Sequence, residues 1–151
     1  GVVCLVGATL SHEAVGGFSG LIENLSSSPD FEFSGNTLNR VARGGVLATT
    51  RGKVRIENNK ILNTGHSGVI IANDASHKYE SGSVRDAVIR LNAFMNCEES
   101  SIVIKPHIKK YVASIHKNIK IDNNLFVLFV HFPNTFVSLS LAEGDEIQKS
   151  I

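Results

Sequence analysis

The sequence predicts an all-β protein, wound as a right-handed parallel β-helix. Three observations predict this fold: strand-like segments that recur along the chain, an asparagine at the same place in each, and a composition rich in β-branched residues. Val and Ile supply 29 of the 151 residues, and Asn and Gly supply 13 each. β-Branched residues favour strands, whereas Asn and Gly favour tight turns. No segment carries the apolar stripe and end caps of an amphipathic helix.

Four segments of the repeat align without a gap. Each is an alternating strand, then an asparagine, then an apolar residue two places later. The segments span residues 31–38, 54–61, 87–94 and 119–126. Their asparagines, Asn36, Asn59, Asn92 and Asn124, are 23, 33 and 32 residues apart. The shortest step fits one turn of a stacked coil, and the longer steps fit the same turn with a loop added.

The two faces of these strands differ, because alternate side chains point to opposite sides of a strand. The apolar face collects Phe31, Phe33, Val54, Ile56, Ala87, Ile89, Ile119 and Ile121, with Leu38, Ile61, Phe94 and Phe126 after the turn. The other face carries Ser34, Glu57, Arg90 and Asp122. Stacking places Arg90 between two carboxylates, which favours this register. Asparagine fits the turn, since it tolerates a left-handed backbone and its amide can bond the neighbouring coil.

Short apolar segments between the repeats predict the remaining walls of each coil, at residues 46–48, 68–72 and 101–104. Polar insertions over 73–83 and 106–117 interrupt the period. The expected architecture is therefore a pectin-lyase-like solenoid. A β-sandwich is the alternative, but it does not explain asparagines at matched positions.

One β-helix domain is expected over residues 1–151, as a piece of a longer protein that is incomplete at one or both ends. The chain begins with Gly, and neither end shows the cap that a solenoid needs. Residues 127–151 are expected to be irregular or to form a terminal coil.

Composition argues against several classes of protein. A net charge of +1 offers no electrostatic footprint for nucleic acid or for an anionic membrane surface. No apolar run approaches the ~18 residues that a membrane helix needs. Two cysteines, Cys4 and Cys97, are too few for a disulfide framework or a four-ligand zinc site. Metal and nucleotide motifs are absent, so no metal or other cofactor is expected.

The insertion at 73–83 is the densest polar cluster, and it holds two carboxylates, Asp74 and Glu80. Cleavage of a glycosidic bond usually needs two carboxyl groups, which makes this pair the catalytic candidate. Solvated surface acids are the alternative interpretation. Substrate-binding candidates around them are Arg43, His66, Asn73 and Lys105. Arg43 could hold a sugar by paired hydrogen bonds.

The order of several segments resembles glycoside hydrolase family 110, over about residues 20–126. The most specific part is Tyr-Glu-Ser-Gly at 79–82, followed by Val-Arg-Asp at 84–86. Other matching segments lie at 43–47, 50–54, 56–59, 70–75, 116–119 and 122–124. This family comprises bacterial α-1,3-galactosidases that are built on a parallel β-helix and remove terminal galactose with inversion.

The resemblance implies that Asp74 and Glu80 lie at or near the sugar-binding face. Asn73 stands where the family commonly has an acidic residue. A second acidic motif of the family, two Asp followed by Asn and His, would lie upstream of Gly1, and an essential carboxylate there would leave this chain inactive alone.

The predicted function is therefore an inverting exo-α-1,3-galactosidase that acts on terminal α-galactosides and needs no cofactor. Export to the periplasm or the exterior is expected from the resemblance, and the oligomeric state stays open. A non-catalytic β-helix module that binds carbohydrate or has a structural role is the alternative. A lyase acting on acidic polysaccharide would want a calcium site and a basic cleft, and the sequence indicates neither.

Overall fold

A computed structural model describes residues 26, 28–74, 83–107, 115–127, 136–139 and 147–149. These residues form strands and no α-helix. The strands are β1 (Phe31–Ser34), β2 (Thr37–Val41), β3 (Val46–Ala48), β4 (Val54–Glu57), β5 (Lys60–Thr64), β6 (Val69–Asp74), β7 (Ala87–Arg90), β8 (Ala93–Cys97), β9 (Ile102–His107), β10 (Ile119–Asp122), β11 (Leu125–Val127), β12 (Val137–Leu139) and β13 (Ile147–Lys149). Among them there is no helix that is both long and apolar enough to cross a membrane.

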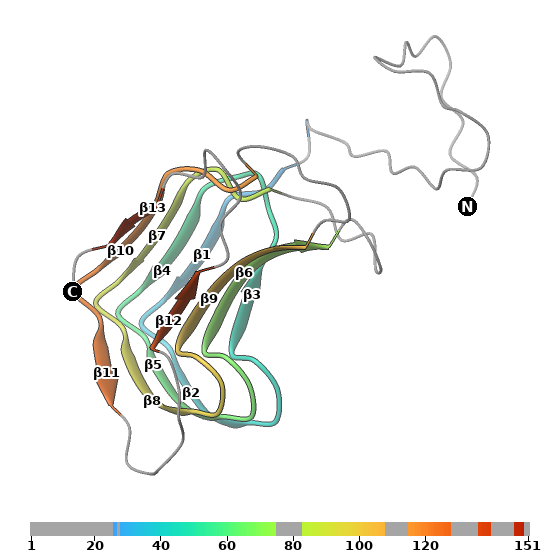
Figure 1. The fold of residues 1–151 in the computed structure, drawn as a ribbon. Helices are drawn as coiled ribbons and strands as arrows, with labels where there is room; N and C mark the ends of the chain where they lie inside the picture. Colours follow the sequence, from blue (N-terminus) through green and yellow to red (C-terminus); the bar gives the residue numbers. More distant parts are fainter. Residues whose placement is uncertain are drawn as a thin grey trace, which may run out of the picture.

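The strands assemble into three parallel sheets, which the chain visits in turn (Figure 1). Sheet A has the order β1-β4-β7-β10-β13, sheet B the order β11-β8-β5-β2, and sheet C the order β12-β9-β6-β3. Each circuit through the three sheets lies directly against the one before it. Every pairing between the described strands is parallel, which rules out the antiparallel β-sandwich that was the alternative. The all-β prediction is confirmed.

The register matches the alignment of the four repeats. In sheet A, Phe31, Val54, Ala87 and Ile119 stand in one column. In sheet B, Leu38, Ile61, Phe94 and Phe126 stand in another. The interior of the wound chain is filled by these columns, and the central strands are the most completely buried. Phe94 and Phe126 stack with ring centres 5.5 Å apart.

The asparagines form the predicted ladder at the turn from sheet A to sheet B. The Oδ1 atoms of Asn59, Asn92 and Asn124 each accept the backbone N–H of the asparagine one coil earlier, at 2.9 to 3.0 Å. The Nδ2 groups donate to strand carbonyls, as from Asn59 to Phe33 O at 2.7 Å and from Asn92 to Ile56 O at 2.8 Å. Asn59 and Asn92 are each only 1% exposed. The buried amides are therefore fully used within the stack.

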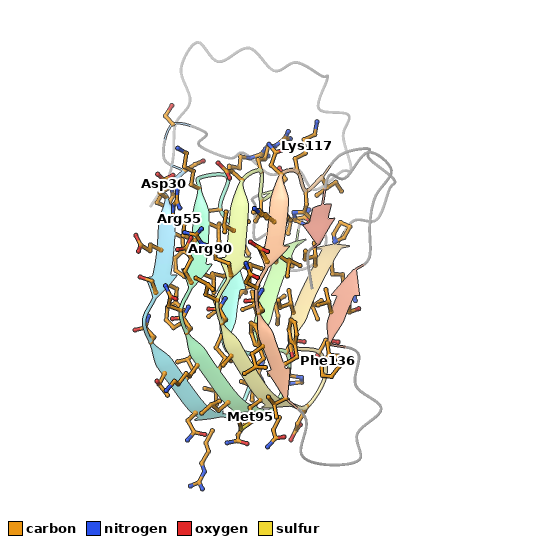
Figure 2. The ribbon with its side chains drawn as sticks, turned by 90° about the vertical axis from the view of Figure 1, so that its left-hand side faces the viewer. Asp30, Arg55, Arg90, Met95, Lys117 and Phe136 are labelled. Carbon is orange, nitrogen blue, oxygen red and sulfur yellow. The ribbon has the colours of Figure 1, made fainter. Side chains whose placement is uncertain are left out.

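The outer face of sheet A carries the predicted charge alternation. The register pairs Glu57 with Arg90 and Arg90 with Asp122. Arg90 Nη2 lies 3.1 Å from Glu57 Oε2, and Arg55 Nη1 lies 3.6 Å from Glu57 Oε1. Figure 2 shows Arg55 and Arg90 on neighbouring strands of this sheet.

Two strands of sheet C are longer than the sequence predicts. The apolar segments ended at residues 72 and 104, but β6 continues to Asp74 and β9 to His107. The extension is mutual, because Asn73 pairs with Pro106 and Asp74 with His107. A polar residue can thus continue a strand when its neighbour in the sheet extends alongside it.

Leu91 occupies a backbone conformation that suits it poorly. Its φ angle is +56°, and the equivalent residues Gly35, Asn58 and Asn123 have φ angles of 69°, 56° and 50°. The left-handed conformation costs a leucine roughly 1–2 kcal/mol, whereas glycine and asparagine adopt it readily. The side chain is 52% exposed and contributes little burial.

Leu91→Asn is therefore expected to raise the free energy of unfolding by about 1 kcal/mol. Urea unfolding measures the change. Leu125→Asn is the control, because Leu125 is similarly exposed but lies in an ordinary strand. An equal gain in both variants would attribute the effect to lost surface leucine and not to the backbone.

Candidate functional site

The turns from sheet B to sheet C repeat the same geometry in three coils. Val41, Thr64 and Cys97 are in register before the turn, and Val46, Val69 and Ile102 after it. Since each turn has the same length, Arg43, His66 and Glu99 occupy equivalent positions in successive coils. Sequence repetition therefore builds a column of polar side chains at the entry to sheet C.

Glycine permits this turn to lie close against its neighbours. A Cβ atom on Gly68 would lie 2.7 Å from the carbonyl oxygen of Ser101 and 2.8 Å from Phe94 Cδ1. A Cβ atom on Gly45 would likewise lie too close to its neighbour, 2.5 Å from the carbonyl oxygen of Gly68. The close packing of successive coils sets the position of the polar column.

Two coils are joined in this column by hydrogen bonds to one carboxylate. Nδ1 of His66 lies 2.9 Å from Glu99 Oε1, and the Ser67 hydroxyl donates to Glu99 Oε2 at 3.1 Å. The His66 and Glu99 side chains remain 51% and 57% exposed. A protonated Nδ1 donates to the carboxylate, so the second ring nitrogen and the remaining lone pairs of Glu99 are available to other groups.

The hydrogen bond from His66 lowers the pKa of the Glu99 carboxyl below its ordinary value, against a smaller opposing effect of burial. Three smaller effects also lower this pKa: the hydrogen bond from Ser67, the charge of His66 and the charge of Lys105. A lowered pKa in the folded state contributes stability at pH above the unfolded value, and that contribution is lost as pH falls through the folded pKa.

His66→Ala is therefore expected to raise the pKa of Glu99 toward its ordinary value, because the largest cause of the shift is removed. An NMR titration of the Glu99 carboxyl carbon measures this directly. Glu98→Ala, at the adjacent exposed residue, is the control and should leave the Glu99 midpoint unchanged, because Glu98 is not among the causes of the Glu99 shift. A Glu99 midpoint that is unchanged by the substitution would contradict the assignment.

The outer face of sheet C is hollowed beside this carboxylate. The hollow has a volume of about 410 Å³. It is lined by Ser67, Ile70, Ala72, Glu99, Ser100, Val103, Lys105 and Ser138. Its apolar part comes from outward-facing positions of β6 and β9. Its polar part comes from the preceding turns, from Lys105 on β9 and from Ser138 on β12. Small-molecule sites commonly combine an apolar lining with a few placed polar groups.

The structure brings some of the predicted site residues together. His66 reaches the hollow through Glu99, and Lys105 lines it directly. Arg43 is exposed and occupies the turn position of His66, one coil before His66. Asn73 is 8% exposed, on the same side of β6 as the buried Val69 and Ile71, and thus away from the hollow.

The two predicted catalytic residues are placed only in part. Asp74 is the last residue of β6, and its backbone pairs with His107 at the end of β9. Glu80 lies outside the described residues. Within the part of the chain that the structure describes, no three His, Cys, Asp or Glu side chains are grouped so as to hold a metal ion.

Sequence reasoning missed Glu99, Ser67 and Ser138 as members of the hollow. A signal for Glu99 was present, because it follows His66 by 33 residues, the same interval that separates Asn59 from Asn92. Extending the repeat through the turn into sheet C would have aligned the two. Ser138 comes from β12, outside the four aligned segments.

Comparison with curated proteins identifies relatives for most of this chain. It is 41% identical to alpha-1,3-galactosidase A of Bacteroides thetaiotaomicron over an alignment of 108 residues, and this alignment covers 72% of the chain. It is 40% identical over 121 residues to alpha-1,3-galactosidase B of the same organism, and 34% identical over 122 residues to alpha-1,3-galactosidase A of Akkermansia muciniphila. The resemblance to α-1,3-galactosidases is confirmed.

The similarity is confined to one region of these galactosidases. The chain spans about a fifth of the length of those relatives, 19% in both Bacteroides proteins and 20% in the Akkermansia protein. A scan against models of protein families finds no match.

Proposed function

We propose that this chain is part of a glycoside hydrolase that removes terminal α-1,3-linked galactose with inversion. The observation that carries the proposal is the 32–41% identity to several proteins named alpha-1,3-galactosidase over some 70–80% of this chain. Because the chain matches a fifth of those relatives, we expect it to supply one part of the site within a longer protein.

The proposed scaffold is a right-handed parallel β-helix of the pectin-lyase type, forming a single domain over residues 1–151. The three parallel sheets and their circuit order support it. Right-handed crossovers between parallel strands are strongly favoured, since strand twist then packs the connection onto the sheet. Residues 127–151 are proposed to contain the terminal coil, and strands β12 and β13 in this region each extend a sheet.

Asp74 and Glu80 are the proposed catalytic or galactose-binding carboxyl groups. In an inverting reaction one carboxyl group gives its proton to the glycosidic oxygen while the other takes a proton from the attacking water. The two groups stand ~6.5–9.5 Å apart so that water fits between them and the sugar. Arg43, His66 and Lys105 are proposed to bind substrate, whereas Asn73 is buried and faces away from the hollow. Among these, Lys105 at the hollow offers a donor to sugar hydroxyls.

The anomeric form of the released sugar tests the proposal. We expect the intact protein that carries this chain to release galactose from α-1,3-galactobiose, with β-galactose appearing first in a proton NMR time course. α-Galactose appearing first would overturn inversion. Cleavage of internal bonds in longer glycans would overturn exo-action.

Absence of galactose release would overturn the enzyme proposal itself. Binding of the disaccharide without turnover would instead favour a non-catalytic carbohydrate-binding module. A secretion assay on the parent bacterium tests the further expectation that the protein is exported, by measuring it in the periplasm or the medium.

A further inference from the structure

We propose that the hollow on the outer face of sheet C binds the sugar to which the terminal galactose is attached. The proposal depends on Glu99, which lines the hollow and is not among the site residues that the sequence predicts. This inference rests on the proposed function, since it names the part of the substrate that this surface recognises.

The position of the hollow along the strands supports a leaving-group site. Ile70 and Ala72 lie on β6, four and two residues before Asp74. At about 3.3 Å per strand residue, they lie roughly 7–13 Å from Asp74 along the chain. If galactose is cleaved next to Asp74, a sugar unit on one side of the scissile bond has room in the hollow.

The charge of the hollow favours a neutral ligand. Among the described residues that line it, Glu99 supplies one carboxylate and Lys105 one ammonium group, and the other side chains are uncharged. These opposite charges leave no net charge to attract an acidic or basic ligand. A neutral sugar fits this lining, because it carries no charge and its hydroxyl groups can bond both Glu99 and Lys105.

Glu99 retains hydrogen-bonding capacity for such a ligand. A carboxylate offers about four lone-pair sites, and the bonds from His66 and Ser67 use one site on each oxygen. These two bonds hold the carboxylate in one orientation at the edge of the hollow. A held carboxylate can accept sugar O–H groups with little loss of side-chain freedom on binding.

The floor of the hollow suits the other surface of a sugar. Ile70 and Val103 are adjacent in register on β6 and β9, and both line the hollow. Leu47 continues the same row on β3 and is 52% exposed. An apolar floor can pack against the C–H groups of a pyranose ring while the polar rim bonds its hydroxyls.

The test compares two substrates in the intact protein. α-1,3-Galactobiose has a leaving-group sugar, whereas p-nitrophenyl α-galactoside has none. Glu99→Ala is expected to lower kcat/KM for the disaccharide about 10–100-fold, as expected for a lost hydrogen bond to a charged group. For the aryl substrate the change should stay below about 3-fold, because that substrate makes no such bond.

Glu98→Ala is the matched control. Glu98 is the adjacent residue, it is exposed, and it does not line the hollow. Neither substrate should respond to it. Equal losses on both substrates in Glu99→Ala, or no loss on either, would overturn the leaving-group site while leaving the galactosidase proposal intact.

A protein without turnover would overturn the proposed function, but ligand-binding measurements would still test this inference. Calorimetry would then compare α-1,3-galactobiose with methyl α-galactoside. Weaker binding of the disaccharide alone in Glu99→Ala, with Glu98→Ala unchanged, supports the hollow as the second sugar's site. No disaccharide binding, or equal weakening of both ligands, overturns it.

Discussion

Asn92→Ala is expected to lower the free energy of unfolding by about 4 kcal/mol, because it removes a buried residue that serves two neighbouring coils. Oδ1 of Asn92 accepts the backbone N–H and the Nδ2 group of Asn59, both at 3.0 Å. Its own Nδ2 donates to Ile56 O at 2.8 Å. An unsatisfied buried polar group costs about 1–3 kcal/mol, and the substitution creates several.

Two other members of the same ladder provide a graded control. Asn36 is exposed, and its Nδ2 group donates to Ser34 O at 2.9 Å, so Asn36→Ala should cost less than about 1 kcal/mol. Asn124 is partly buried, and Asn124→Ala should have an intermediate effect. Urea unfolding of the three variants measures the series.

The order of the three values decides the interpretation. A similar loss in Asn36→Ala and Asn92→Ala would show that burial of the amide does not set its contribution. If Asn92→Ala does not fold, the comparison of Asn124→Ala with Asn36→Ala still measures the effect of depth in the ladder.

Asp74→Asn and Glu80→Gln are each expected to lower kcat on α-1,3-galactobiose by about 10²–10⁴-fold in the intact protein, the range typical of general acid and base groups. Each substitution preserves the shape of the side chain but removes its ability to exchange a proton. Galactose release under saturating substrate measures the loss. Unchanged hydrolysis in both variants would reject this pair as the catalytic residues.

The pH profile assigns the two roles. A general base must be ionised and a general acid protonated, so activity falls at low pH because of the base and at high pH because of the acid. The variant that lacks the base should lose the fall at low pH, and the variant that lacks the acid should lose the fall at high pH. Glu98→Gln, at an exposed turn residue, should keep both limbs and the full rate.

Much of the fold was predictable because it repeats. A repeated strand presents its alternate residues to the same neighbours in every coil, so aligned sequence positions become adjacent positions in space. Asn59, Asn92 and Asn124 bond one another as the alignment requires. Glu57 and Arg90 form the expected pair for the same reason.

The candidate site was less predictable, since it lies where the repeats were not aligned. Lys105 and His66 were selected individually, and only the register shows that one lines the hollow and the other bonds its carboxylate. The lengths of β6 and β9 also escaped prediction, because pairing with a neighbour extended polar ends that have weak strand propensity alone.

Local pattern by itself determined which residues face inward, where the asparagine turns fall, and which segments of sheets A and B stack. These properties follow from side-chain alternation and from the turn preference of asparagine, which act over a few residues. Tertiary structure alone decided that Glu99, Ser67, Lys105 and Ser138 would meet around one hollow. Ser67 and Ser138 come from the coils on either side of the one that carries Glu99 and Lys105, and only the hydrogen-bonded register between coils brings such distant residues within reach of one another.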